Sequence, residues 1–141
     1  MTARKLAVAI TFVLVGASLS HAQLTGAKAK DPSLQAAMEA RQSAINMRNG
    51  AESEKCTAAE FVNVSADGEI LSRESRLKAQ SSGPATPRNS TLIDSVRMFG
   101  PDAAVSIQRN PGTNNRITIV WVRQGGAWKA ASSHTSTIKA K

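Results

Sequence analysis

Only a few side chains of this sequence have the chemistry of a catalytic group. The chain contains two histidines and one cysteine, and His134 is the histidine that lies beyond the apolar N-terminal segment. Imidazole titrates near neutral pH, so His134 is suited to proton transfer or to hydrogen bonding a polar ligand. The candidate partner is Asp94, a carboxylate that shares a strand face with apolar Leu92, Val96 and Met98. An Asp94–His134 pair would perform acid–base chemistry.

Both residues also have non-catalytic explanations. His134 could hydrogen-bond a neighbouring strand, and Asp94 could be exposed at its strand's start, where charge is tolerated. A buried carboxylate without a partner is costly, so Asp94 is expected to be exposed, paired or in a polar pocket. Catalysis requires the two side chains to converge to about 3 Å, directly or through one water.

Metal and disulfide chemistry are not expected. One histidine and one cysteine beyond the N-terminal segment cannot supply the His/Cys cluster that zinc requires, so neither a metal site nor a cofactor is predicted. Cys56 is the only cysteine and cannot form an intrachain disulfide. It is either a small, semi-buried apolar side chain or a thiol available for an intermolecular disulfide or a redox step.

The element that carries His134 is predicted to form a pocket wall. Strict alternation along the last strand puts Trp128, Ala130, Ser132, His134 and Ser136 on one face. The small residues between the tryptophan and the histidine would leave space above the strand. With a contribution from the first helix, the predicted pocket lining is Trp128, Ser132, His134 and Met38.

That strand belongs to a closing β-hairpin, Arg116–Ser136, with a Gly-Gly turn. Its first strand is apolar on both faces, although a sheet with one solvated face should alternate apolar and polar residues. The second face is therefore covered by another element or by a second subunit, and a homodimer through the sheet is the preferred explanation. The predicted core or dimer residues are Ile117, Ile119, Val120, Trp121 and Val122.

A long amphipathic helix is expected at the front of the fold. Asp31-Pro32 supplies an N-cap acceptor and a proline at the first helical position, and Gly50 offers a stop after about Asn49. Arg41 interrupts the apolar stripe, where it could extend along the rim or reach into a pocket; the rim is the preferred position. The stripe comprises Leu34, Ala37, Met38, Ala44 and Ile45.

The remaining elements suggest one α+β domain. A weaker helical turn at 51–59 and a short strand at 61–64 precede an Asp67-Gly68 turn. A second helix at 73–80 is capped by Ser72, and strands are predicted at 91–99 and 103–109. Helices in front of a run of antiparallel strands are typical of the α+β class.

The N-terminus has the layout of a secretory signal. Arg4 and Lys5 precede an apolar run, Leu6–Val15, and Ser20-His21-Ala22 fits a cleavage site. We expect a cleaved signal peptide at 1–22, a flexible lead at 23–30, a single domain at 31–137 and a tail at 138–141. The mature protein would be exported, periplasmic or secreted, without a stable membrane anchor.

The chain is basic, with 18 Lys and Arg residues against 10 Asp and Glu residues and a net charge of +8. The basic residues are scattered, the chain has no tyrosine, and Trp121 and Trp128 are expected in the core, so no aromatic platforms for stacking bases are expected near the charges. No nucleic-acid partner is predicted. The charge is interpreted as a solvated surface that could attract anionic surfaces or anionic ligands.

Three segments together resemble the nuclear transport factor 2-like superfamily. They are Gly68–Arg73, which opens a helix, Val96–Gly100, which precedes Asp102–Val105, and the closing hairpin with its Trp-x5-His-x-Ser ending. The chain is similar to the SnoaL-like branch, domain of unknown function 4440, in an exported form. The resemblance implies a cystatin-like α+β roll: a cone-shaped, strongly curved antiparallel sheet wrapped around N-terminal helices, with an open-ended pocket and dimers through the outer sheet face.

Three functions are compatible with these observations. The preferred hypothesis is a non-enzymatic, exported homodimer that binds a small, mostly apolar ligand in the cone. The alternatives are a SnoaL-like lyase, isomerase or cyclase that uses His134 and Asp94, and a dimerisation module without a ligand. Ketosteroid isomerases of this superfamily use a tyrosine in the oxyanion hole, and this chain has none; their mechanism is not inherited.

Overall fold

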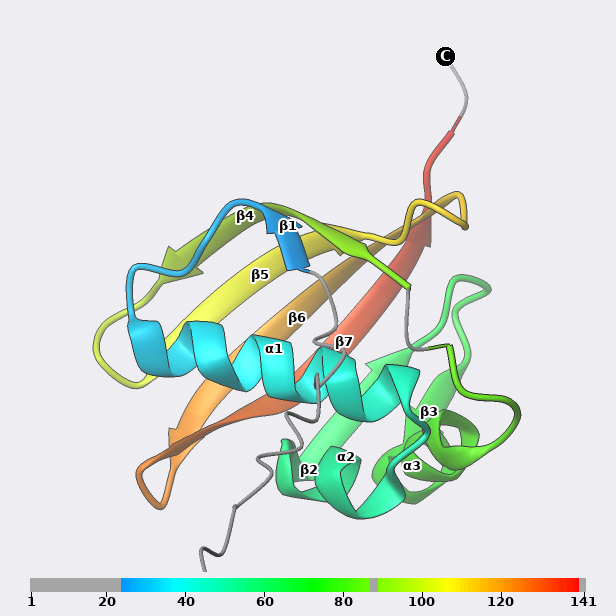
Figure 1. Ribbon diagram of the computed structural model, residues 1–141, viewed down its shortest axis with the longest axis horizontal. Coiled ribbons are helices and arrows are strands. Elements are labelled where there is room, and N and C mark those ends of the chain that lie inside the picture. Colours follow the sequence, from blue (N-terminus) through cyan, green and yellow to red (C-terminus); the bar gives the residue numbers. More distant parts are fainter. Residues whose placement is uncertain (1–23, 87–88, 140–141) are drawn as a thin grey trace, which may run out of the picture.

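The computed structural model describes residues 24–86 and 89–139 of the chain. They form an α+β fold in which helices cover one face of a strongly curved, seven-stranded sheet (Figure 1). The face toward the helices is called the inner face and the other the outer face. The predicted signal peptide, residues 1–22, lies outside the described residues.

The first long helix, α1 (Pro32–Asn46), begins where its capping chemistry predicts. The Asp31 carboxylate accepts hydrogen bonds from the backbone N–H groups of Ser33, at 2.8 Å, and Leu34, at 3.4 Å. These bonds satisfy donors that the first helical turn leaves without partners. The start of α1 is therefore encoded locally by the Asp-Pro pair.

The end of α1 differs from the prediction. The helix ends at Asn46, and Arg48 takes the left-handed conformation, with φ 57°, in place of the expected Gly50. Arg48 also donates hydrogen bonds to the carbonyl oxygens of Gln80 and Pro84. Gly50 instead opens the short helix α2 (Gly50–Lys55), because Asn49 caps it.

The next segment confirms the predicted turn and second helix. Strand β2 (Thr57–Val64) is longer than expected and is joined by the Asp67-Gly68 turn to β3 (Ile70–Ser72). Gly68 has φ 87°, a conformation that glycine adopts at no steric cost. Helix α3 (Arg73–Ser81) follows, with Ser72 as its N-cap.

Four longer strands complete the sheet: β4 (Thr91–Met98), β5 (Ala103–Arg109), β6 (Asn115–Gln124) and β7 (Ala127–Thr137). The strand order is β1-β4-β5-β6-β7-β2-β3. The predicted antiparallel sheet is corrected to a mixed one, because β2 pairs with β7 in parallel and β1 pairs with β4 in parallel. These pairings join segments far apart in sequence, so no local pattern indicates them.

The first strand lies in the lead that was expected to be flexible. Strand β1 (Leu24–Gly26) pairs with the start of β4, and the Ala27 N–H donates to the carbonyl of Ile93 at 2.9 Å. A side chain at Gly26 would place its Cβ 2.4 Å from that same carbonyl oxygen. Glycine therefore permits the close approach of the lead to β4.

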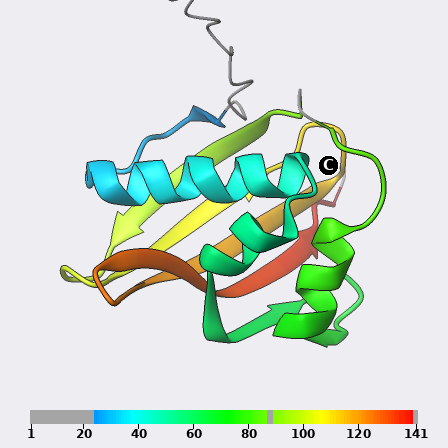
Figure 2. The ribbon, with the colours of Figure 1, turned by 60° about the horizontal axis from the view of Figure 1, so that its bottom comes forward.

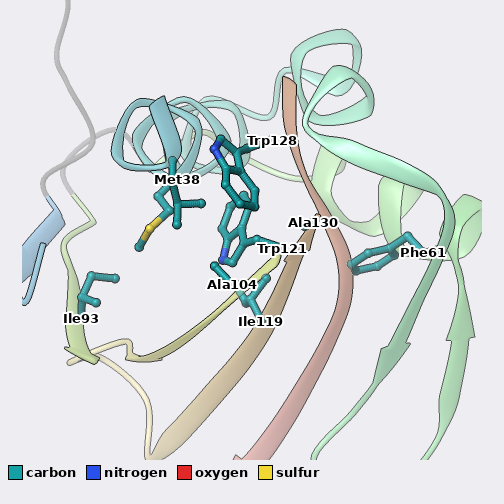
Figure 3. Packing of buried hydrophobic residues seen from close by; sticks show 9 residues of the cluster. Met38, Phe61, Ile93, Ala104, Ile119, Trp121, Trp128 and Ala130 are labelled. Carbon is teal, nitrogen blue, oxygen red and sulfur yellow. The ribbon is translucent and has the colours of Figure 1, made fainter. Parts of the chain in front are cut away.

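The core fills the space between α1 and the inner face of the sheet (Figure 3). Trp121 is 1 % exposed, and its indole N–H donates to Ser106 Oγ at 2.9 Å, which satisfies the buried donor. Phe61 of β2 packs on the far side of β7 from the tryptophans. The buried apolar cluster comprises Leu34, Met38, Phe61, Ile93, Ala104, Ile119, Trp121, Trp128 and Ala130.

A β-bulge in β7 changes which residues of that strand face inward. Trp121 pairs with Ala130 while Val120 pairs with Ser132, so Ala131 has no partner on β6. A single extra residue reverses the alternation of every side chain that follows it. Accordingly, Trp128 and Ala130 point inward before the bulge, and Ser133 is the buried residue after it.

Candidate functional site

The bulge places the predicted pocket residues of β7 on the wrong face for a pocket. His134 is exposed and pairs across the outer face with Thr118 and Val64. Ser132 likewise lies on the outer face, opposite Val120. The prediction that Trp128, Ser132 and His134 share one face is therefore wrong, because it assumed unbroken alternation.

Asp94 is not a partner for His134. The Asp94 carboxylate forms ion pairs with Arg109 Nη2 at 2.8 Å and Arg116 Nε at 3.4 Å on the outer face. The hydrogen bond from Arg109, followed by the charges of both arginines, lowers the pKa of Asp94. Asp94 lies beside the cross-strand row Ser95–Ile107–Thr118–His134, which spans three strand spacings, or about 14 Å. The predicted acid–base pair does not form.

Trp128 and Met38 belong to the core and do not line a pocket wall. Trp128 is 4 % exposed, and its indole N–H donates to Ser33 Oγ at 3.1 Å and Asp31 Oδ2 at 3.3 Å. The Arg123 guanidinium stacks on the ring at 4.7 Å and pairs with Asp31 at 2.8 Å. These contacts connect the β6–β7 hairpin to the start of α1.

The residues of β6 divide between the two faces as the sequence indicates. Ile119 and Trp121 are each 1 % exposed and belong to the core. Val120 is 37 % exposed on the outer face, and Val122 lies half-buried beside it. Ile117 is half-buried and borders a cavity on the inner face. The strand thus contributes to the core and also presents an apolar outer surface.

The lining residues place a cavity between the C-terminal half of α1, α3 and the inner face of the sheet. Figure 2 shows how these elements are arranged. The cavity consists of an inner chamber of about 60 Å³ and an adjacent mouth of about 310 Å³, and both are bordered by Arg76, Asn110 and Ile117. The inner chamber is also lined by Arg41, Gln42, Ile45, Thr91, Gln108 and Ser133. The mouth is lined further by Asn63, Ser65, Ala66, Leu71, Thr113, Asn115 and Thr135.

Arg41 is the most deeply buried charged group of this cavity. The residue is 5 % exposed, and its Nε has no hydrogen-bond partner among the described residues. Burial, and secondarily the nearby charge of Arg76, lowers the pKa of Arg41 to about 10. The guanidinium is therefore still protonated at neutral pH. The rim position preferred from the sequence is wrong, because Arg41 reaches into the pocket.

Arg76 contributes a second unpaired guanidinium from α3. Its buried Nε also lacks a partner within the described part of the chain, and burial lowers the pKa of Arg76. Neither arginine is among the ion pairs formed by residues 24–86 and 89–139. Buried guanidinium groups in proteins are normally paired with a carboxylate, so this pair is unusual.

The rest of the lining is uncharged and combines amide and hydroxyl side chains with apolar Ile45, Ala66, Leu71 and Ile117. Neither chamber is bordered by an aspartate, glutamate, histidine or cysteine. Ser133 donates a hydrogen bond to Asn63 Oδ1 at 2.6 Å beneath the cavity, which fixes the floor of β2 and β7. The arrangement can bind and orient a ligand, but its lining holds no general acid or base poised near neutral pH.

The spacing along α1 explains why Arg41 points into the fold. Leu34, Met38 and Arg41 follow one another at intervals of four and three residues, which places them on one buried helix face. Arg76 was not identified from the sequence. The sequence did contain a signal for a polar cavity. In β5, polar Ser106 and Gln108 occupy the buried face of an alternating strand.

Cys56 is half-buried and free in the structure. Burial raises the pKa of its thiol, although the positive charge of Arg41 acts in the opposite direction. The thiol is thus protonated at neutral pH, and a thiol is a weaker nucleophile than a thiolate. This environment favours the interpretation of Cys56 as a small apolar side chain.

Residues 24–86 and 89–139 contain no cluster of three His, Cys, Asp or Glu side chains that could hold a metal ion. Among the same residues, the helices lack the length and hydrophobicity that a membrane span requires.

Solved structures share this fold. An NTF2-like protein of unknown function from Silicibacter pomeroyi matches with a TM-score of 0.65 and 20 % identity, over 75 % of this chain and 93 % of that one. An NTF2-like protein of unknown function in nutrient uptake from Rhodospirillum rubrum gives 0.60 and 22 %, over 73 % and 96 %. A DUF3225 family protein of unknown function from Pectobacterium atrosepticum gives 0.59 and 19 %, over 77 % and 90 %.

These likenesses establish the fold. The chain has the NTF2-like fold, also described as cystatin-like, as the resemblance of its sequence implied. No family model matches the sequence, and no curated protein matches it. The assignment to the domain of unknown function 4440 branch stays a prediction.

Proposed function

We propose that this NTF2-like domain is an exported, homodimeric binding protein that holds a small polar molecule in the cavity between α1, α3 and the sheet. The observation that carries the proposal is the pair of guanidinium groups at the cavity, Arg41 and Arg76, with buried nitrogen atoms that lack partners. A ligand would supply the missing acceptors, and buried polar groups in folded proteins nearly always have partners.

The ligand differs from the mostly apolar one expected from the sequence. That expectation rested on small residues around His134, which lies on the outer face. Beside four apolar side chains, the cavity lining carries guanidinium, amide and hydroxyl groups. Such groups lose their hydration when an apolar molecule covers them, so the lining favours a polar ligand.

Binding without catalysis is the better-supported activity. The SnoaL-like alternative needs two proton-transfer groups within reach of one substrate. Asp94 is paired with two arginines, and His134 is on the outer face about 14 Å away. An enzyme would have to use groups outside the cavity lining, and no observation favours that.

The outer face of the sheet supports the homodimer. Val62 of β2 is 41 % exposed and Val120 of β6 is 37 % exposed, and they flank Ser132 of β7 on either side. Half-buried Val105, Ile107 and Val122 extend this outer apolar band across β5 and β6. An apolar surface of this kind typically covers itself against an identical copy. The same band is the basis of a second candidate function, a dimerisation module without a ligand.

Export is proposed from the N-terminal sequence alone. Cleavage after Ala22 would release a mature chain that begins at Gln23 and keeps β1 intact. N-terminal sequencing of the protein recovered from an export-competent bacterium should therefore give Gln-Leu-Thr. An unprocessed N-terminus in the exported fraction contradicts the signal-peptide assignment.

Native mass spectrometry tests ligand binding. The mature chain, purified without denaturation, should carry a small-molecule adduct that is lost under denaturing conditions. Arg76→Gln should lack the adduct, whereas Arg97→Gln, an equal charge change at an exposed residue outside this cavity, should retain it. An adduct-free wild-type protein that also gains no ligand from a cell extract contradicts the proposal and leaves the dimerisation module.

A further inference from the structure

We propose, building on the proposed function, that the ligand is an oxyanion on a hydroxyl-rich body, with its carboxylate or phosphoryl head between Arg41 and Arg76. The body would lie in the amide-lined mouth. Four observations support this assignment: the unpaired guanidinium groups, their mutual repulsion, the placement of the acidic residues, and the shape of the cavity.

The two guanidinium groups offer the donors that an oxyanion requires. A guanidinium presents N–H groups in a planar fork that matches the oxygen atoms of a carboxylate or a phosphoryl group. The Nε atoms of Arg41 and Arg76 are both buried and both without partners in the described residues. Arg41 is 5 % exposed, so water satisfies it poorly. An anion would satisfy both groups together.

The repulsion between the two arginines points to the sign of the missing charge. Arg41 and Arg76 lie close enough for the charge of Arg76 to lower the pKa of Arg41. Two like charges in a partly desolvated site destabilise the empty protein. A neutral ligand would leave that repulsion in place, whereas an anion between them would reverse it.

The protein places its acidic residues away from this site. Asp94 pairs with Arg109, Asp31 pairs with Arg123, and Glu54 pairs with Arg73. Each of these pairs is partly exposed, whereas neither Arg41 nor the cavity around it borders a carboxylate. The unpaired arginines thus do not reflect a shortage of acidic side chains. They are the positions at which an external anion fits.

The cavity has a small inner chamber, which would hold the charged head of the ligand, and a larger mouth, which would hold its polar body. The inner chamber, of about 60 Å³, accommodates only a small group, and Gln108 lines it beside the arginines. The mouth, of about 310 Å³, presents amide and hydroxyl groups of Asn63, Asn110, Asn115 and Thr135 beside three apolar side chains. These groups donate and accept hydrogen bonds, as the hydroxyl groups of a polyol do. An alkyl tail would leave them without partners.

Thermal unfolding with four matched probes tests this assignment. Gluconate and glycerol 3-phosphate combine an anionic head with a hydroxylated body, and sorbitol and glycerol are their neutral counterparts. The better anion should raise the melting temperature of the mature chain in a concentration-dependent way, by about 5 °C near saturation. Comparison of the two anions identifies the head as carboxylate or phosphoryl. The neutral probes should have no effect.

Variants assign the effect to the two arginines. Arg76→Gln and Arg41→Met should each weaken binding of the better anion at least about tenfold, because a charge-assisted hydrogen bond is lost. Arg97→Gln should bind as the wild type does. Arg76 is on a separate helix and only half-buried, so Arg76→Gln decides the question if Arg41→Met does not fold.

Three outcomes contradict the inference. Equal binding of sorbitol and gluconate would show that the charge is not recognised, and the proposed binding function would stand. Hexanoate, a further probe, has the same carboxylate head as gluconate on an alkyl body. Tighter binding of hexanoate than of gluconate would contradict the inference that the ligand has a hydroxylated body. If neither anion raises the melting temperature but the wild-type protein still carries an adduct in native mass spectra, the oxyanion is rejected and the binding function stands. If the wild-type protein carries no adduct either, the binding function is rejected too.

Discussion

Arg41 carries a buried, unpaired charge that the proposed anion would neutralise. Its guanidinium is 5 % exposed, unpaired at Nε and close to the like charge of Arg76. The sequence contained this information in part, because Arg41 interrupts an apolar helix stripe. The stripe could not distinguish the rim from the pocket, since a flexible arginine can extend in either direction.

Replacement of this arginine should stabilise the ligand-free protein. Arg41→Met removes a buried, unpaired charge and keeps much of the side-chain volume. We expect the free energy of unfolding to rise by about 1–3 kcal/mol. Urea denaturation of the ligand-free chain measures the change, with Arg97→Met as the matched exposed control, for which about 0.5 kcal/mol or less is expected. A loss of stability in Arg41→Met would mean that the arginine is a structural residue.

At the scale of elements, the sequence predicted the helix caps and the hairpin turn, but not which residues of β7 face inward. The caps Asp31 and Ser72 and the Gly125-Gly126 turn act within a few residues, and the structure confirms all three. The bulge at Ala131 is different, because no glycine or proline marks it. It depends on how β7 fits between β6 and β2, so His134 was assigned to the wrong face.

The cap of α1 should make stability depend on pH in the acid range. The hydrogen bond from Ser33, which is the largest cause, lowers the pKa of Asp31 below 3.8 in the folded protein. The fold therefore favours the ionised carboxylate. The stabilisation is fully present above the unfolded pKa and is lost as the pH falls through the lower, folded pKa.

Asp31→Asn tests this linkage, because asparagine keeps the capping acceptor and removes the charge. The free energy of unfolding of the wild type should exceed that of the variant at pH 7, and the difference should shrink at pH 3. Ser33→Ala should lower the wild-type advantage as well, since it removes the main hydrogen bond to the carboxylate. A difference that stays constant between pH 7 and pH 3 contradicts the assignment.

At the scale of the whole molecule, the resemblance of the sequence predicted the fold that solved structures share with this chain. The mixed sheet, with β2 parallel to β7, escaped prediction because it depends on pairing between distant segments. The sequence pattern of β6 predicted an apolar outer strand face, and Val120 on that face is 37 % exposed. The homodimer proposed for that face is a prediction.

Val120→Lys tests the homodimer without touching the cavity. A charge in the middle of the outer apolar band should dissociate the dimer, because the interface would bury an unpaired ammonium group. Light scattering of the mature chain should give a dimeric mass for the wild type and a monomeric mass for the variant. Ala36→Lys, at an exposed position of α1 that borders neither chamber, is the control. A monomeric wild type would contradict the proposed interface.

The most direct test of the proposed anion site is a crystal structure of the mature chain grown with the better-binding anion. We expect one oxyanion in the inner chamber, with its oxygen atoms about 2.7–3.0 Å from nitrogen atoms of both Arg41 and Arg76. The hydroxylated body should lie toward Asn63 and Asn115. A chamber closed by the protein's own side chains, or either arginine paired with a carboxylate of the chain, would contradict the proposed anion site.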